Sequence, residues 1–308
     1  YGECNLQKSG GKGVIRMNGR KKLHRLTVFD YINYAFLLLC VVVMIYPFVF
    51  VLGGSFSDGQ DYMNGGVWLL PRVWTFANYQ VIVSDNLLWI AYRNTMIRTL
   101  FGSLFSLSFT SLVAYAMSRK ELKFRGFFQI FNLITMFFGG GLIPYFALIN
   151  FLGLYDNFLV YFIPSLYSVY NMIVITGGYA SVSEEMHDSA VIDGAGELRI
   201  WLQIYFPLSK AVHATVLLWL AVGNWNAYYG TMIYTRGGPD VIMLQYYLMG
   251  VINKAGYTPD VGGEILERVT SKTVSYAAIV IAMLPILFVY PFLSKYFTKG
   301  VFVGSLKG

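Results

Sequence analysis

The run FLLLCVVVMIYPFVFVL, Phe36–Leu52, decides the class of fold because it holds no charged residue over most of the length of a membrane-crossing helix. Such a helix needs about 20 predominantly apolar residues, and with its flanks the run extends from 31 to 52. The whole 308-residue chain has this character: 56% of its residues are hydrophobic and 13% are charged, against roughly a quarter charged in soluble domains. The sequence therefore predicts an all-α integral membrane protein.

Five further stretches have the length and apolar character of a membrane span. The third span, 127–148, is interrupted by Gly139–Gly141 and contains Pro144, so it is either a broken helix or a helix followed by an early loop. We predict six transmembrane helices within one membrane domain, residues 31–297. The five stretches after the first are 95–117, 127–148, 158–180, 211–229 and 274–293.

Lys and Arg residues are distributed unevenly between the loops on the two sides of the predicted spans. Sixteen lie in the head before Asp30, in the loops 118–126 and 181–210 and in the tail after 294, whereas six lie in the loops of the other side. Cytoplasmic loops carry such an excess, so both termini are predicted to be cytoplasmic. Residues 1–30 then form a basic cytoplasmic segment and 298–308 a cytoplasmic tail; the long charged head does not fit a cleavable signal.

Arg98 is the remaining one of the 23 Lys and Arg residues, and it lies at the start of the second predicted span. An arginine there either extends its guanidinium to the outer interface or takes part in a transport pathway. The net positive charge needs no nucleic-acid partner, because membrane topology accounts for it.

Groups for covalent chemistry are scarce. The cluster Gly10–Gly13 lacks the Ser or Thr that completes a phosphate-binding loop, and the three histidines are not paired at metal-ligand spacing. Cys4 and Cys40 offer neither a disulfide framework nor a zinc site. We therefore expect no cofactor, metal or catalytic residue in this chain, and expect any transport to take its energy from a partner.

The most informative segment is the predicted cytoplasmic loop SEEMHDSAVIDGAGELRIWLQIYFPLSKA, Ser183–Ala211. Glu184–Asp193 has helical spacing, Gly194 breaks the pattern, and a second amphipathic run ends at Pro207. The pattern predicts a helix, a glycine turn and a second helix on the cytoplasmic surface. Such a hairpin is either an amphipathic surface feature or a knob that docks into a groove of another protein.

This loop resembles the EAA loop of ABC importer permeases. Asp188, Ser189 and Ala190 stand where Glu-Ala-Ala is usual, and the DGA at 193–195 is typical of the sugar-uptake branch. Ile204, Phe206 and Pro207 resemble the closing I-x-L-P, with Phe for the usual Leu. The segments SRKELKFRG, GGGLIPYFALINFLGLYDN, GNWNAYYG and KGVFVGSLKG resemble the second permease subunit of carbohydrate importers, in the branch that handles oligosaccharides and polysaccharide fragments in Gram-positive bacteria.

The resemblance implies a type I ABC importer permease fold that forms half of a translocation pore for an oligosaccharide. The implied partners are a second permease subunit, a cytoplasmic ABC ATPase dimer that binds ATP and Mg, and an extracellular, lipid-anchored solute-binding protein. The implied location is the plasma membrane of a bacterium, most closely a Gram-positive one, in contact with membrane lipid. By matching positions, the coupling to the ATPase falls on Glu185, Asp188, Ser189, Ala190, Asp193, Gly194, Ala195 and Pro207.

The predicted substrate pathway is less specific. Aromatic rings beside amides suit the apolar faces and hydroxyl rims of sugars, but the same residue types also pack helices and form interfacial belts. Both interpretations stay open for Asn171, Asn224, Trp225, Asn226 and Tyr229.

Three other functions fit the sequence less well. An ABC permease for a non-sugar solute would not explain the DGA or the sugar-like segments. A stand-alone channel or secondary carrier would leave the coupling-like loop unexplained, and an intramembrane enzyme lacks catalytic groups.

Overall fold

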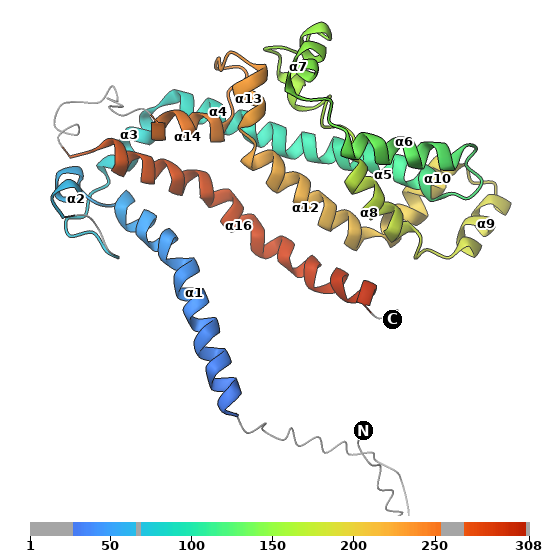
Figure 1. The fold of residues 1–308 in the computed structure, drawn as a ribbon, viewed down its shortest axis with the longest axis horizontal. Helices are drawn as coiled ribbons and strands as arrows, with labels where there is room; N and C mark the ends of the chain where they lie inside the picture. The colour runs from blue at the N-terminus through green and yellow to red at the C-terminus, as the bar shows by residue number, and fades with distance from the viewer. Residues whose placement is uncertain (1–26, 66–68, 254–267, 306–308) are drawn as a thin grey trace, which may run out of the picture. The chain divides into compact units, whose positions relative to one another are not determined.

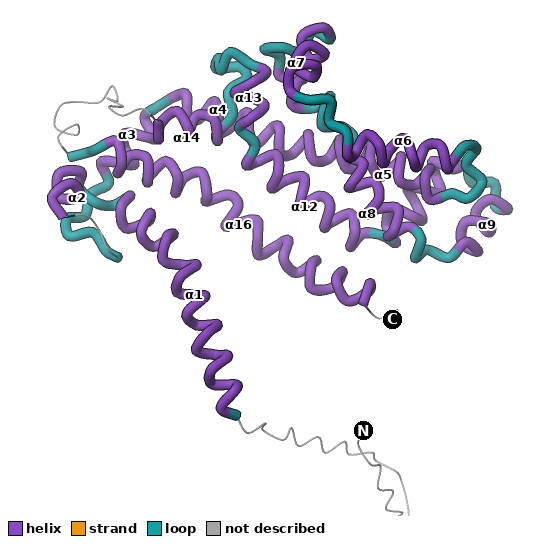
Figure 2. Tube along the Cα trace, viewed as in Figure 1, coloured by secondary structure: helices purple, strands orange, loops and turns teal. Residues whose placement is uncertain are grey.

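The computed structural model describes residues 27–65, 69–253 and 268–305, with side chains described as far as 288. Within these ranges every regular element is a helix, apart from an isolated bridge between Ser57 and Trp74; Figure 1 and Figure 2 show their course. The chain divides into two units, residues 1–47 and 48–308. Most of the predicted basic segment 1–30 lies outside the described residues.

The first unit contributes most of α1 (Val28–Ser55), which is apolar and long enough to cross a membrane. Its start is fixed by Asp30, whose carboxylate accepts hydrogen bonds from the backbone N–H of Thr27 at 2.7 Å and from its hydroxyl at 2.8 Å. Such pairing at the first turn satisfies a donor that the helix leaves free.

The second unit is organised around one continuous helix of 33 residues, Asn86–Ser118. It consists of α4 (Asn86–Ile97), the π-helical turn η1 (Arg98–Gly102) and α5 (Ser103–Ser118). At 1.5 Å per residue this helix is about 50 Å long, so it crosses a bilayer with length to spare. It contains the predicted second span.

The third predicted span is a broken helix. It consists of α6 (Arg125–Phe137) and α7 (Leu142–Phe151), which are bent by 111°. Gly140 and Gly141 between them have φ of +65° and +88°, a region that residues with a side chain rarely adopt. The glycine run therefore makes the bend, and a second helix follows it, as a broken span or a re-entrant loop would have.

The fourth predicted span, 158–180, is not a single helix, and this expectation was wrong. The stretch contains the 3₁₀ turn η2 (Phe158–Tyr161) and, after an irregular segment with Pro164, α8 (Val169–Tyr179). The 11 residues of α8 reach only about 16 Å at 1.5 Å per residue. Hydropathy counts the apolar residues of this stretch, but it does not register the break.

The fifth and sixth predicted spans correspond to α12 (Lys210–Asn226) and α16 (Ser271–Ser305). Three described helices are long and apolar enough to cross a membrane alone, and five segments qualify if each bent pair counts as one span. The remaining helices are short: α2 (Gly59–Gly65), α3 (Ala77–Ser84), α9 (Glu184–Ile192), α10 (Glu197–Ile200), η3 (Trp201–Tyr205), α11 (Phe206–Leu208), α13 (Tyr229–Tyr234) and α14 (Leu244–Asn253).

Two apolar cores hold the second unit together. In one, α3, α4, α14 and α16 bury residues such as Ile82, Leu88 and Leu244. In the other, α5, α8, α12 and the segment α10–η3 bury Ile175, Tyr179 and their neighbours. Because α12 packs against α5 and against α16, it joins the two cores (Figure 1).

Two adjacent glycines of α8 allow the α8–α12 contact to be tested. A Cβ on Gly178 would lie 2.8 Å from the side chain of Val212, whereas a Cβ on Gly177 meets nothing within 4 Å. We expect Gly178→Leu to destabilise the purified chain by about 1–3 kcal/mol through overpacking, and Gly177→Leu not to. Thermal unfolding in detergent measures both, and equal midpoints for the two variants would contradict this packing.

Candidate coupling site

The loop between α8 and α12 is a helical hairpin whose turn is closed by backbone hydrogen bonds. After α9, the N–H of Ala195 donates to the carbonyl of Ala190 at 2.9 Å, and the N–H of Gly194 donates to that of Val191 at 3.0 Å. This pair of bonds is the Schellman arrangement that ends many helices. It needs a left-handed residue, which Gly194 provides with φ of +77°. The predicted helix, glycine break and second helical run are confirmed.

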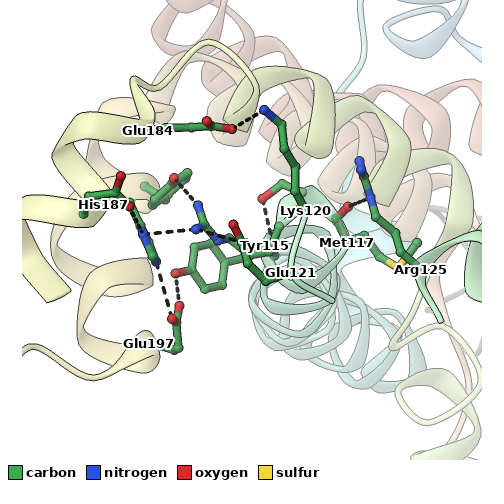
Figure 3. Close-up of polar contacts among 12 residues, drawn as sticks. Tyr115, Met117, Lys120, Glu121, Arg125, Glu184, His187 and Glu197 are labelled. Atoms are coloured by element: carbon green, nitrogen blue, oxygen red, sulfur yellow. Dashed lines mark hydrogen bonds and ion pairs between the residues drawn. The ribbon is translucent and has the colours of Figure 1, made fainter. Parts of the chain in front are cut away.

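A group of polar contacts fastens this hairpin to the end of α5 (Figure 3). The hydroxyl of Tyr115 donates to the carboxylate of Glu197 at the start of α10, and the second oxygen of Glu197 lies 3.4 Å from Nε2 of His187 on α9. Arg119, just after α5, donates through Nη2 to Nδ1 of His187 at 3.0 Å and through Nη1 to the Tyr205 hydroxyl at 3.2 Å. We call these five residues the anchor.

His187 joins charged groups on both sides of its ring. Nδ1 faces the guanidinium of Arg119 at 3.0 Å and the carboxylate of Asp188 at 3.2 Å, and Nε2 faces Glu197. The hydrogen bond from Tyr115, with a smaller contribution from His187, holds the pKa of Glu197 below its usual range, so the carboxylate stays charged at neutral pH.

A second junction lies deeper. The indole N–H of Trp201 lies 3.1 Å from the Tyr179 hydroxyl and 3.2 Å from that of Ser111. Tyr179 also contacts Nε2 of His213 at 2.9 Å, and Nδ1 of His213 lies 3.2 Å from the carbonyl of Phe206. These bonds join η3 to α5, α8 and α12, so the hairpin is fastened to three helices of the second unit.

A cavity of about 760 Å³ opens between the end of α5 and the hairpin. Its walls combine anchor residues with apolar side chains such as Leu112 and Val191. On the hairpin, Met186, Val191, Leu198 and above all Ile192, which is 85% exposed, leave apolar surface open to a partner.

Relatives of known transport systems match the chain almost from end to end. It is 30% identical over 284 residues to the polygalacturonan/rhamnogalacturonan transport system permease protein YtcP of Bacillus subtilis, with 91% of this chain and 99% of the relative covered. It is 32% identical over 282 residues to Protein LplC of the same organism, covering 91% and 95%. This chain belongs to the carbohydrate permeases of ABC transporters. No protein-family model matches it.

Solved structures agree with this family. The permease superposes with a TM-score of 0.83 and 33% identity on a chain of a bacterial ABC transporter involved in the import of the acidic polysaccharide alginate, over 88% of this chain and 96% of the other. A chain from the bacterial alginate ABC transporter in complex with an alginate pentasaccharide-bound periplasmic protein has a TM-score of 0.57 at 14% identity, over 86% and 93%. This second similarity concerns the fold alone.

The predicted coupling residues of the permease lie on both faces of the hairpin. Ala190 and Ala195 are half-buried and pack against the core that contains Tyr179. The Ser189 hydroxyl donates to the Glu185 carbonyl within α9 at 2.8 Å. The remaining members are exposed, and the side chain of Asp188 is 72% exposed. These exposed residues are Glu185, Asp188, Asp193, Gly194 and Pro207.

The predicted pathway residues are not gathered into one site by the contacts described. Trp225 is 4% exposed, packs edge-on against Tyr92 and donates to the carbonyl of Ala282 at 3.2 Å, which favours the packing interpretation. Asn226 lines a separate cavity of about 470 Å³ together with Tyr228. Asn171 is buried on α8, Tyr229 is exposed at the start of α13, and Asn224 contacts Arg98.

The burial of Arg98 disfavours the interpretation that its guanidinium extends to the outer interface. Arg98 is 9% exposed, lies over the ring of Tyr161 at 4.7 Å and donates to Asn224 at 3.3 Å. The anchor was not predicted from the sequence. His187 and Arg119 are 68 positions apart, and neither belongs to a catalytic or metal-binding motif.

The anchor can be tested by hydrogen exchange. Arg119→Ala removes the donor to His187 and Tyr205, and hydrogen bonds to charged groups contribute about 1.5–3 kcal/mol. We therefore expect amide exchange in α9 to rise by about tenfold or more. Lys120→Ala is the matched control, because the pair Lys120–Glu184 is exposed on both sides and such pairs contribute about 0–1 kcal/mol. Equal exchange in the two variants would refute the anchor.

Proposed function

We propose that this permease forms half of the pore of an ATP-driven importer that takes up an oligosaccharide delivered by an extracellular binding protein. The observation that carries the proposal is the hairpin fastened to α5, α8 and α12 by the anchor and the Trp201 junction. The nearly full-length similarity to a polygalacturonan/rhamnogalacturonan transport permease and to an alginate importer chain supports a saccharide as the substrate. Neither the non-sugar permease nor the stand-alone carrier gains support from any of these relatives.

The hairpin suits a docking role. Its exposed face combines acidic residues, Glu185, Asp188 and Asp193, with the apolar side chains of Ile192 and Leu198. An apolar patch with a polar rim is typical of a site that enters a partner's groove. We propose that the groove belongs to a cytoplasmic ABC ATPase dimer, which binds the ATP and Mg that this chain has no loop to hold.

The anchor offers a mechanical route from that partner to the pore. When the ATPase dimer closes, the displacement of α9 passes to Glu197 and His187, and from them through hydrogen bonds to Tyr115 and Arg119 at the end of α5. Because α4, η1 and α5 are one continuous helix, the displacement continues into the membrane. The pore would then alternate between outward-open and inward-open states.

The arrangement in the membrane follows from the same proposal. We propose six spans, of which the fourth is not one helix but η2, α8 and the irregular segment between them, with both termini in the cytoplasm and a second permease subunit that completes the pore as a heterodimer. The excess of Lys and Arg in the loops that include 118–126 and 181–210 supports this orientation. Relatives in Bacillus subtilis support a bacterial plasma membrane, and we propose that it is Gram-positive in type and that the binding protein is lipid-anchored.

The turn of the hairpin provides a test of coupling. Valine at position 194 would have to adopt a φ of +77°, which costs on the order of 1–3 kcal/mol, so Gly194→Val should open the Schellman turn. We expect ATP-dependent uptake to fall about tenfold or more for a change of that size, while the protein remains in the membrane. Gly196→Val is the control, because Gly196 has a φ of −75° and open space at its Cβ. Undiminished uptake by Gly194→Val would show that the hairpin does not couple.

The composition of the complex tests the whole proposal. The permease is purified from native membranes, the co-purifying proteins are identified, and ATP hydrolysis is measured after reconstitution. We expect a second permease and an ATPase whose rate rises with a sugar-loaded binding protein. Recovery of this chain alone, without ATP-dependent activity, would contradict an importer.

A further inference from the structure

Arg98 is a buried cation in the middle of the helix Asn86–Ser118. Its neighbours in the described part of the chain are neutral: Nε donates to Oδ1 of Asn224 on α12 at 3.3 Å, and the guanidinium lies over the ring of Tyr161. Asn224 is itself held by a hydrogen bond from its Nδ2 to the Ser103 hydroxyl at 3.1 Å. The plane of the guanidinium is therefore fixed by α12 and η2 together.

The charge of Arg98 is not balanced within the described residues. No ion pair there involves Arg98, and its Nη1 is buried without a hydrogen-bond partner. The contacts with a ring face and one neutral amide offset only part of the desolvation free energy of a buried cation. An uncharged residue at this position would avoid that cost, so the free Nη1 points to an anionic partner from outside the described residues.

We propose that Arg98 determines substrate specificity by binding a carboxylate of an acidic oligosaccharide, which makes the substrate of this importer a chain that contains uronic acids. The inference rests on the proposed function and names the substrate class for it. A guanidinium presents two parallel N–H groups that match the oxygens of a carboxylate, which a lysine does not. Asn224 and Tyr161 act as positioning residues, because they orient the guanidinium without carrying charge.

Because Nη1 is buried, the contact between Arg98 and a substrate carboxylate forms only in another conformation of the transport cycle. In the conformation described here Nη1 is enclosed, so the carboxylate reaches it when the helices around η1 separate. A ligand that binds one conformation better than another shifts the population toward that conformation. Arg98 lies in a π-helical turn, a form of helix often found at functional sites, and the same continuous helix carries Tyr115 of the anchor. Substrate charge and ATPase coupling therefore act on one helix.

The main alternative is a carboxylate supplied by the second permease subunit, in which case Arg98 would hold the pore together and would not select the sugar. The two cases differ in what a charge-removing substitution does. Loss of a substrate contact lowers uptake of acidic sugars alone, whereas loss of an intersubunit ion pair lowers uptake of every sugar and weakens assembly.

The test uses the complete reconstituted importer with wild-type permease, Arg98→Gln, Arg98→Lys and Arg93→Gln, the last being the control at an exposed arginine of α4. The probes are an oligogalacturonide and its carboxyl-reduced neutral counterpart, and ATP-dependent uptake of each is measured together with basal ATP hydrolysis. We expect wild type to favour the oligogalacturonide. Arg98→Gln should lower that uptake by about tenfold or more while uptake of the neutral counterpart stays at the wild-type level, Arg98→Lys should be intermediate, and Arg93→Gln should match wild type.

Three results would overturn the inference. They are uptake of the oligogalacturonide within twofold of wild type in Arg98→Gln, an equal loss of acidic and neutral uptake, and a wild-type importer that takes up only the neutral sugar. The last result leaves the importer function intact, whereas ATP-dependent uptake of no oligosaccharide at all would overturn the proposed function itself. If Arg98→Gln does not assemble, Arg98→Lys decides, because a selective loss of acidic uptake supports the inference and unchanged uptake refutes it.

Discussion

The carboxylate of Glu197 receives a hydrogen bond from Tyr115 across 82 positions of the sequence, and His187 reaches the same carboxylate from the neighbouring helix. This shared acceptor determines where the hairpin sits, because a nine-residue helix such as α9 is too short to be stable alone in water. The Schellman turn at Gly194 sets the angle between α9 and α10, and the acceptor then fixes the hairpin against α5. A force on the exposed face of α9 therefore meets hydrogen bonds to charged groups as well as the apolar contact of Ala190.

Both π-helical turns of the described chain lie at contacts between several helices. The turn η1 brings Arg98 toward α12 and η2, and η3 brings Trp201 toward α5 and α8. In a π turn the ladder of backbone hydrogen bonds is widened by one residue, which rotates the following side chains. The permease uses this local change to direct one polar side chain into each helix junction.

The sequence predicts those features that depend on neighbours along the chain. The left-handed turn at Gly194, the break at Gly140–Gly141 and the apolar character of α1 follow from single residues and short runs. The fourth span was mispredicted because hydropathy does not distinguish a helix from an irregular apolar segment such as 162–168. The environment of Arg98 and the anchor could not be predicted, since each depends on which distant helix supplies the acceptor. A hydrogen bond between positions 98 and 224 produces no hydrophobic periodicity or short motif that a single sequence would reveal.

The two faces of the short helix α9 carry different sets of side chains. The inward side of α9 carries His187 of the anchor, and its outward side carries Asp188 and Ile192. Ile192 makes none of the hydrogen bonds of the anchor, so under the proposed coupling a substitution there would change the docking surface and leave the anchor in place. Under the proposed coupling, one ATPase would serve several permeases that share these few exposed side chains. The pore-side residues would then diverge freely, so that new sugars could be taken up without a new source of energy.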